Sequence, residues 1–154
     1  MISDGDIYMD VTSSIIKFIE DWRKANASSA GYFDWDAHAQ EGELPKSPEV
    51  LIGPAGIGMT EEETEMFEVV FAIGVSTYND KNLFTLRSMI SKLFGALRVG
   101  QSLNVYDAST GALKGTMVIK TPRAVTPVTK AEIRSQQFIE LTAALNPAAT
   151  SSLR

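Results

Sequence analysis

The sequence contains no cysteine and a single histidine, His38, among its 154 residues. The lack of cysteine excludes disulfide bonds, thiolate zinc sites, iron–sulfur clusters and cysteine nucleophiles. A single histidine also excludes a metal site with several histidine ligands. The chain has no run of about 18 consecutive apolar residues, so we expect no membrane span. These absences point away from most enzymes.

Positive charge is scarce as well, with 14 Lys and Arg residues against 19 Asp and Glu residues and a net charge of −5. Such an acidic balance argues against a protein that binds nucleic acid by neutralising many phosphates. The apolar fraction of 44% and the charged fraction of 21% are ordinary for a folded globular domain. The first residues lack the basic start and apolar run of a signal peptide, so we expect a cytoplasmic site of synthesis and folding.

Hydrophobic periodicity predicts two amphipathic helices. Apolar residues recur every three or four positions in residues 6–24, and again in residues 83–97. The first helix presents Ile7, Val11, Ile15, Phe18 and Trp22 on one face. A turn and helix cap at residues 79–82 precedes the second helix.

Strict alternation of apolar and polar residues predicts strands elsewhere. The clearest strand is Met66 to Tyr78, whose length favours a central place in the sheet. Shorter strands are expected at 49–54, 102–106 and 112–121, with a Gly-rich bend at 53–58. Near the C-terminus, Thr129 and Glu132 have the spacing of a capping box, which would start a helix, whereas residues 135–145 alternate as in a strand. We prefer a helical turn near 130–133 followed by a strand at 135–145, and a helix over 134–145 stays the alternative. The order predicts one α+β domain, residues 1–145, in which two amphipathic helices pack on one face of a mixed, mostly antiparallel sheet of four to six strands.

Two segments lack periodicity, and we expect both to be mobile: a long loop at residues 26–48 and a C-terminal tail at residues 146–154. The loop contains three aromatic residues, Tyr32, Phe33 and Trp35. Aromatic side chains dominate protein interfaces, so these three are candidate interface residues. The alternative is that their rings pack on the core of their own domain.

The densest charged run consists of Glu61, Glu62, Glu63 and Glu65, which we expect on a turn beside the central strand. One interpretation is a solvated surface that keeps the protein soluble. The other is a negative surface that repels or guides a polyanion through its summed field.

Residues with reactive side chains do not form a convincing catalytic or metal-binding pattern. Asp34, Asp36 and His38 lie close in sequence, but they supply too few ligands for a metal site. Gly56-Ile57-Gly58 begins a phosphate-binding pattern that lacks its third glycine and is followed by glutamates. A serine nucleophile would have to use His38, and no nucleophile-elbow motif is present. We expect no catalytic, cofactor-binding or metal-binding residue, and hence no enzyme.

The order of these segments resembles the tail terminator, or tail-completion, proteins of long-tailed bacteriophages. The N-terminal helix opens with Asp6-Ile7-Tyr8 and leads into a long polar loop and the strand pair 50–52 and 67–77. Tyr78-Asn79-Asp80 then leads into the second helix, and a hairpin precedes a final strand that contains Phe138-Ile139-Glu140-Leu141. The resemblance covers nearly the whole chain and rests on order and size rather than on a signature motif.

The resemblance implies a structural virion protein of the tail or neck that is assembled in the host cytoplasm. In that family, subunits form a hexameric ring on the tail tube, stop its polymerisation and present a docking surface for the head connector. The implied partners are further copies of this chain, the tail tube protein and head–neck connector proteins. Genomic DNA would pass through the ring without specific binding. Tyr32, Phe33 and Trp35 would then anchor an arm that orders on a neighbour.

Two alternatives stay open. One is another phage neck, collar or head–tail connecting protein, which has the same general character. The other, from a different class, is a small bacterial regulatory or ligand-binding α/β domain.

Overall fold

The computed structural model describes residues 4–38, 44–64, 66–131 and 133–145. Within them, a long helix α1 (Asp4–Asn26) comes first, and a shorter helix α2 (Phe84–Ala96) follows a 3₁₀ turn, η1 (Lys81–Leu83). The strands are β1 (Gly31–Tyr32), β2 (Val50–Glu63), β3 (Met66–Tyr78), β4 (Ser102–Tyr106), β5 (Leu113–Val125), β6 (Thr129–Ala131) and β7 (Arg134–Leu145).

The strands form one sheet in the order β1-β2-β3-β7-β5-β4, and β6 pairs with β7. The β1–β2 pair is parallel, whereas the other described pairs are antiparallel. The predicted class, an α+β domain with a mixed and mostly antiparallel sheet and two helices, is confirmed. The predicted central position of β3 is also confirmed, because β3 pairs with β2 on one side and with β7 on the other.

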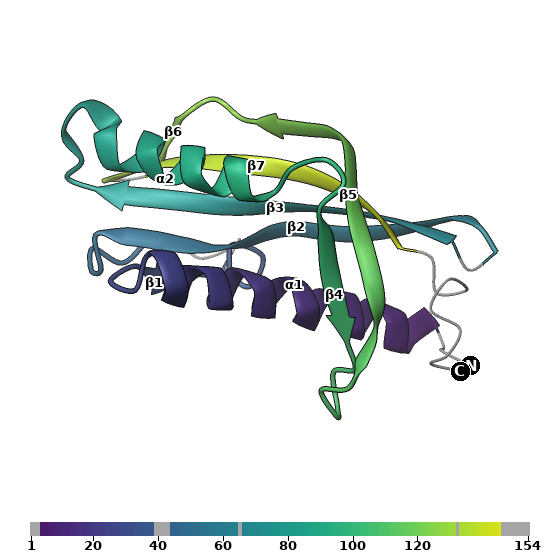
Figure 1. Ribbon diagram of the computed structural model, residues 1–154. Coiled ribbons are helices and arrows are strands. Elements are labelled where there is room, and N and C mark those ends of the chain that lie inside the picture. Colours follow the sequence, from purple (N-terminus) through teal and green to yellow (C-terminus); the bar gives the residue numbers. More distant parts are fainter. Residues whose placement is uncertain (1–3, 39–43, 65, 132, 146–154) are drawn as a thin grey trace.

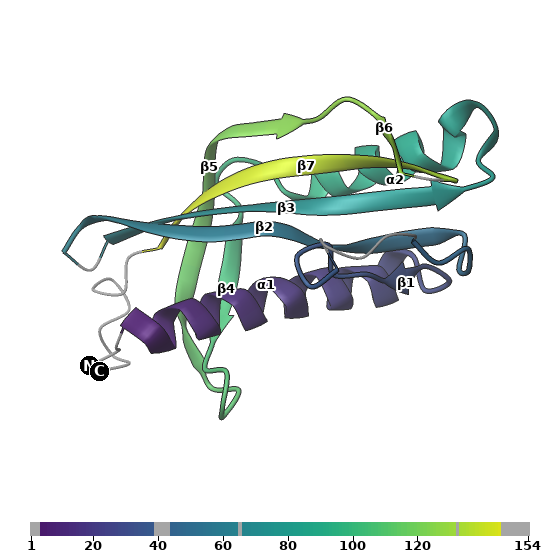
Figure 2. The ribbon, with the colours of Figure 1, turned by 180° about the vertical axis from the view of Figure 1, so that it is seen from behind.

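The sheet curves strongly because β5 changes direction along its length (Figures 1 and 2). Its first part pairs with β4 and with the C-terminal end of β7, and its last residues pair with the middle of β7. The pairing register shifts between Lys120 and Ala124, and such an irregularity bends a strand and increases its twist. The result is a half-barrel. Helix α1 packs against β2 and β4, and α2 packs against β3 and β7.

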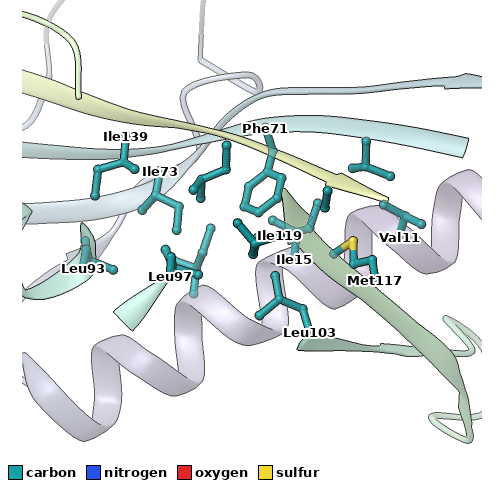
Figure 3. Close-up of a cluster of buried hydrophobic side chains, with 14 of the residues drawn as sticks. Val11, Ile15, Phe71, Ile73, Leu93, Leu97, Leu103, Met117, Ile119 and Ile139 are labelled. Atoms are coloured by element: carbon teal, nitrogen blue, oxygen red, sulfur yellow. The ribbon is translucent and has the colours of Figure 1, made fainter. Parts of the chain in front are cut away.

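The core fills the concave side of this half-barrel, where both helices lie (Figure 3). Phe71 and Ile73 from β3 and Ile139 from β7 are almost fully buried there. Helix α1 contributes Val11 and Ile15, α2 and its C-cap contribute Leu93 and Leu97, and β4 and β5 contribute Leu103, Met117 and Ile119. The apolar positions that predicted the two helices are therefore the ones that cover the sheet.

The expectations for residues 53–58 and for residues near 130–133 are wrong. Residues 53–58 are not a bend, because β2 continues through them to Glu63. Gly56 adopts a φ of 61°, and the register with β3 shifts between Ala55 and Gly58, so the glycines form a bulge inside the strand. The helical turn expected near residues 130–133 is instead β6, in which Lys130 pairs with Ser135 of β7. The predicted tail, residues 146–154, lies outside the described residues.

Candidate assembly surfaces

The convex, outer face of the sheet is divided into a covered end and an uncovered end. At the covered end, the chain between α1 and β2 passes over the outer face of β3 and β7, where Trp35 lies on Gly74 and Phe138. The Trp35 ring meets the Phe138 ring edge to face with 5.4 Å between the ring centroids, and its Nε1–H donates to Gln136 Oε1 at 3.2 Å. An alanine Cβ at Gly74 would lie 2.7 Å from the Phe138 ring and 2.9 Å from the Trp35 ring. A glycine in β3 is therefore what lets both rings approach the strand.

The segment with the three aromatic residues is attached to the edge of β2 through its backbone. Phe33 N–H donates to the Ile52 carbonyl at 3.1 Å, and Trp35 N–H donates to the Pro54 carbonyl at 3.0 Å. The Asp36 carboxylate accepts the N–H groups of Gly56 and Ile57 at 2.7 and 3.3 Å. These bonds extend the pairing of β1 with β2 and satisfy part of an otherwise open sheet edge.

The predicted interface residues Tyr32, Phe33 and Trp35 are thus brought together on their own domain. Phe33 and Trp35 are half-buried, with 4.9 Å between their ring centroids, whereas Tyr32 remains 36% exposed. Burial raises the pKa of Tyr32 to about 12, and the carboxylates of Asp34 and Glu20 act in the same direction. The phenol therefore stays protonated and neutral at neutral pH. Of the three rings, Tyr32 is the most accessible to a partner.

The remainder of the covering segment is held by Arg134, which is fully buried. Its guanidinium donates to the carbonyls of Pro45, Lys46, Pro48, Glu49 and Ser76. Burial lowers the pKa of Arg134, while the nearby Glu49 carboxylate opposes that shift. Sequence reasoning did not single out Arg134, because an arginine at the start of a strand looks like an ordinary solvated residue.

The other end of the outer face is uncovered and contains a shallow hollow of about 350 Å³. Strand β3 contributes Val70 and Ala72, β7 contributes Thr142 and Glu140, and the bent part of β5 contributes Pro122 and Ala124. Val70 is 42% exposed, which is high for an apolar side chain in a central strand. Exposed apolar surface with a charged rim is typical of sites where another molecule binds.

The acidic hairpin, defined as Glu61, Glu62 and Glu63 with the start of β3, adjoins this hollow. The three glutamates are exposed, and they lie at the end of β2 rather than on the turn that the sequence predicted, because β2 is longer than expected. Glu65 lies outside the described residues. Lys120 of β5 contacts Glu68 at 3.0 Å and Glu62 at 3.9 Å. Carboxylates therefore outnumber ammonium groups at this end of the sheet.

A second charged surface was missed by the sequence reasoning. We call it the basic face of α2: Lys81, Arg87, Lys92 and Arg98, which are all exposed. Phe84 is 76% exposed on the same side, and Val99 is 53% exposed just after the helix. The signal was present in the sequence, since no acidic residue occurs between Lys81 and Tyr106. Asp80, the carboxylate just before this stretch, accepts the N–H groups of Thr85 and Leu86 at 3.1 and 2.8 Å.

The residues weighed for metal binding or catalysis do not converge in the structure. No group of three or more His, Cys, Asp and Glu side chains in the described part of the chain is arranged to hold a metal ion. His38 is exposed, and its ring stacks on Phe33 with 4.9 Å between the centroids. Gly56 and Ile57 direct their N–H groups to Asp36, so these amides are already occupied by a carboxylate.

Comparisons with known proteins bear on the fold. No protein-family model matches the sequence, and no curated protein matches it significantly. One solved structure, whose name states no function, aligns over 94% of this chain and 96% of its own, with a TM-score of 0.56 and 14% sequence identity. At that identity the likeness concerns the fold alone. Among the described residues, no helix is long and apolar enough to cross a membrane.

Proposed function

We propose that this protein is a structural subunit of a phage tail, a tail terminator that forms a ring on the end of the tail tube and docks to the head–neck connector. The observation that carries the proposal is the uncovered end of the outer sheet face. Its hollow is open and mostly apolar, and the charged side chains in its lining are Glu140 and Arg123. A binding surface of this composition suits a protein partner better than solvent. The order of elements along the chain, which resembles tail terminators, supports that kind of partner.

In this proposal the protein acts through two kinds of contact. One joins copies of the chain into a ring, which closes when the rotation between neighbours suits the symmetry. The other joins the ring to the last ring of the tail tube or to the connector, and we assign it to the uncovered end of the outer face. Genomic DNA passes through the ring, and the acidic net charge of −5 disfavours its retention.

The test is the mass of the protein in solution together with its effect on tail tubes. Native mass spectrometry and negative-stain images should show rings of 16.8 kDa subunits, with six subunits expected from the resemblance. Added to polymerising tail tubes, the protein should bind their ends and fix their length. A monomer that neither forms rings nor caps tubes would contradict the proposal.

A second candidate, a small ligand-binding domain, is favoured by one observation. The hollow of about 350 Å³ falls at the lower end of the size range of small-molecule sites. A ligand for this site should raise the melting temperature of the monomer in a thermal-shift screen, and replacing Ala72 with Trp should abolish that effect.

The same experiment on tail tubes distinguishes a terminator from another neck or collar protein. Another neck or collar protein would form rings that bind the connector and leave tail tubes uncapped.

A further inference from the structure

The basic face of α2 is a solvent-facing surface with cations around an apolar centre. Phe84 and the small residues Ser88, Ser91 and Gly95 follow the exposed side of the helix, opposite the buried Leu86, Ile90 and Leu93. With 3.6 residues per turn, Arg87 falls on one flank of this line and Lys92 on the other. The Phe84 ring is 76% exposed and lies between flanking cations. Such a surface is suited to bind a negatively charged partner, with the aromatic ring as its anchor.

Within the described part of the chain, no acidic side chain forms an ion pair with this surface. Among the residues that the structure describes, the ion pairs involve Lys17, Arg23, Lys114 and Lys120, and none involves a cation of α2. Arg123 approaches the C-terminal end of α2, but it adds positive charge there by donating to the carbonyls of Phe94 and Leu97. The described residues therefore leave the charge of the basic face without an ion-pair partner, although the chain has a net charge of −5.

The complementary surface lies at the opposite end of the same strand. The acidic hairpin directly precedes β3, and η1 and α2 follow shortly after β3 ends (Figure 1). β3 has 13 residues, which corresponds to about 40 Å of extended strand. Helix α2 runs back along β3 and β7 (Figure 1) for about 20 Å, so its C-terminal end still lies about 20 Å short of the acidic hairpin. Charges are screened over about 8 Å at physiological ionic strength. The two surfaces therefore cannot compensate each other within one molecule, but they can between two molecules.

We infer that the basic face of α2 binds the acidic hairpin of a second copy of this chain. Apolar complementarity accompanies the charges: Met66, paired with Glu63, is 41% exposed on the hairpin and can pack on the exposed Phe84 ring. Because the two surfaces differ, the contact is heterologous and leaves a free basic face at one end and a free acidic hairpin at the other. The inference rests on the proposed ring and names the contact that closes it.

Zero-length cross-linking tests the contact directly in the unmodified protein. A carbodiimide joins a lysine amine to a carboxylate only when the two touch, so a bond from Lys92 or Lys81 to Glu62 or Glu63 marks the interface. Mixing ¹⁵N-labelled with unlabelled protein should give cross-linked peptides that combine heavy and light halves. These products should decline as salt rises from about 0.05 to 0.5 M, because salt screens the charges.

Charge reversal provides the second test. Arg87→Glu with Lys92→Glu, or Glu62→Lys with Glu63→Lys, should each weaken self-association about tenfold or more at low salt, and mixing the two variants should restore a pair. The matched control, Lys24→Glu with Lys46→Glu, changes the charge of exposed lysines on other elements and should associate as the wild type does. Circular dichroism melts verify that all variants are folded.

The outcomes separate this inference from the proposed function. If the wild type forms rings and both reversed variants assemble like the control, the inference is overturned while the ring stands. If the wild type never associates, with or without tail tubes, the ring itself fails and the contact with it. If the α2 variant assembles normally but loses binding to DNA in a fluorescence anisotropy assay, the basic face binds nucleic acid instead and the inference is overturned.

Discussion

Arg134 is the residue on which the covered end of the outer face most depends. A fully buried guanidinium is stable only when its N–H groups have hydrogen-bond acceptors. Here the acceptors are backbone carbonyls of residues 45–49 and the carbonyl of Ser76 in β3. The side chain therefore joins residues 45–49 to the end of β3 through backbone carbonyls. This role depends on the fold, because the acceptors are about 60 to 90 positions away in sequence.

Replacing Arg134 with Met should lower the free energy of unfolding by about 3–5 kcal/mol, because several buried carbonyls lose their donor. Urea denaturation followed by circular dichroism measures this loss. Arg134→Lys keeps the charge but supplies fewer donors in a different geometry, so it should fall between the wild type and the Met variant. A Met variant as stable as the wild type would show that water replaces the guanidinium.

Asp107, in the turn between β4 and β5, makes the stability dependent on pH. The N–H groups of Thr110 and Ser109, and then the Lys114 ammonium, lower the pKa of Asp107 to about 2. A lowered carboxyl pKa contributes stability above the unfolded-state value of 3.8, and that stability is lost as the pH falls through the folded value.

Asp107→Asn mimics the protonated side chain, so it should reduce stability at neutral pH and have little effect near the folded pKa of about 2. Unfolding midpoints of variant and wild type, measured across this range, should therefore converge as the pH falls. Asp21→Asn, which removes an exposed carboxylate paired with Lys17, is the control for a surface charge. A difference that stays constant with pH would exclude Asp107 as the titrating group.

At the scale of elements, hydrophobic patterns in the sequence predicted the helices and strands that have one buried face. The 3.6-residue and two-residue periods located α1, α2, β3, β4 and β7, because burial of one face imposes those periods. They failed at β2. The glycines around Gly56 predicted a bend that ends the strand, but β3 pairs with β2 both before and after Gly56, so these glycines form a bulge inside the strand. They also failed at β6. The capping-box spacing of Thr129 and Glu132 favours a helix locally, but a helix there would lose the pairing of β6 with β7.

The attachment of the aromatic segment to β2 depends on a single glycine. An alanine Cβ at Gly53 would lie 1.5 Å from the Phe33 carbonyl oxygen, so the segment would have to move away from the strand. Gly53→Ala should lower stability by about 1–3 kcal/mol and expose Trp35, which a red shift of tryptophan fluorescence detects.

The matched control for this change is Gly58→Ala in the same strand, where the new Cβ would meet a Val70 methyl group at 3.4 Å. We expect that variant to stay within about 0.5 kcal/mol of the wild type. Equal effects of the two substitutions would mean that glycine conformational freedom, rather than the close approach of Phe33, explains the loss. The Gly53 variant also tests the predicted interface residues. If Tyr32, Phe33 and Trp35 anchor an arm on a neighbouring subunit, displacing their segment should change assembly.

At the scale of the whole molecule, the class of fold was predictable, but the surfaces were not. Val70, Ala124 and Thr142 lie far apart in sequence, and strand register and the bend in β5 bring them to one hollow. The basic face of α2 was visible in the sequence as a stretch without carboxylates, but its separation from the acidic hairpin along β3 is a property of the fold. The proposed function depends on how such surfaces are distributed.

In the proposed function, ring closure and tube capping use different surfaces, so one variant can separate them. Val70→Arg with Ala124→Arg places two charges in the hollow, at exposed positions where they do not disturb the core. Because the hollow lies on the outer face of the sheet and the basic face of α2 lies on the other side, we expect this variant to remain folded, to form rings and to lose binding to tail tubes. Leu113→Arg, at an apolar position 54% exposed outside the hollow, should retain both activities. Ring formation by native mass spectrometry and tube capping by electron microscopy are read from the same samples. Loss of rings in the Val70 and Ala124 variant would instead place the contact between copies on the outer face, and unimpaired capping would show that the tail tube binds another surface.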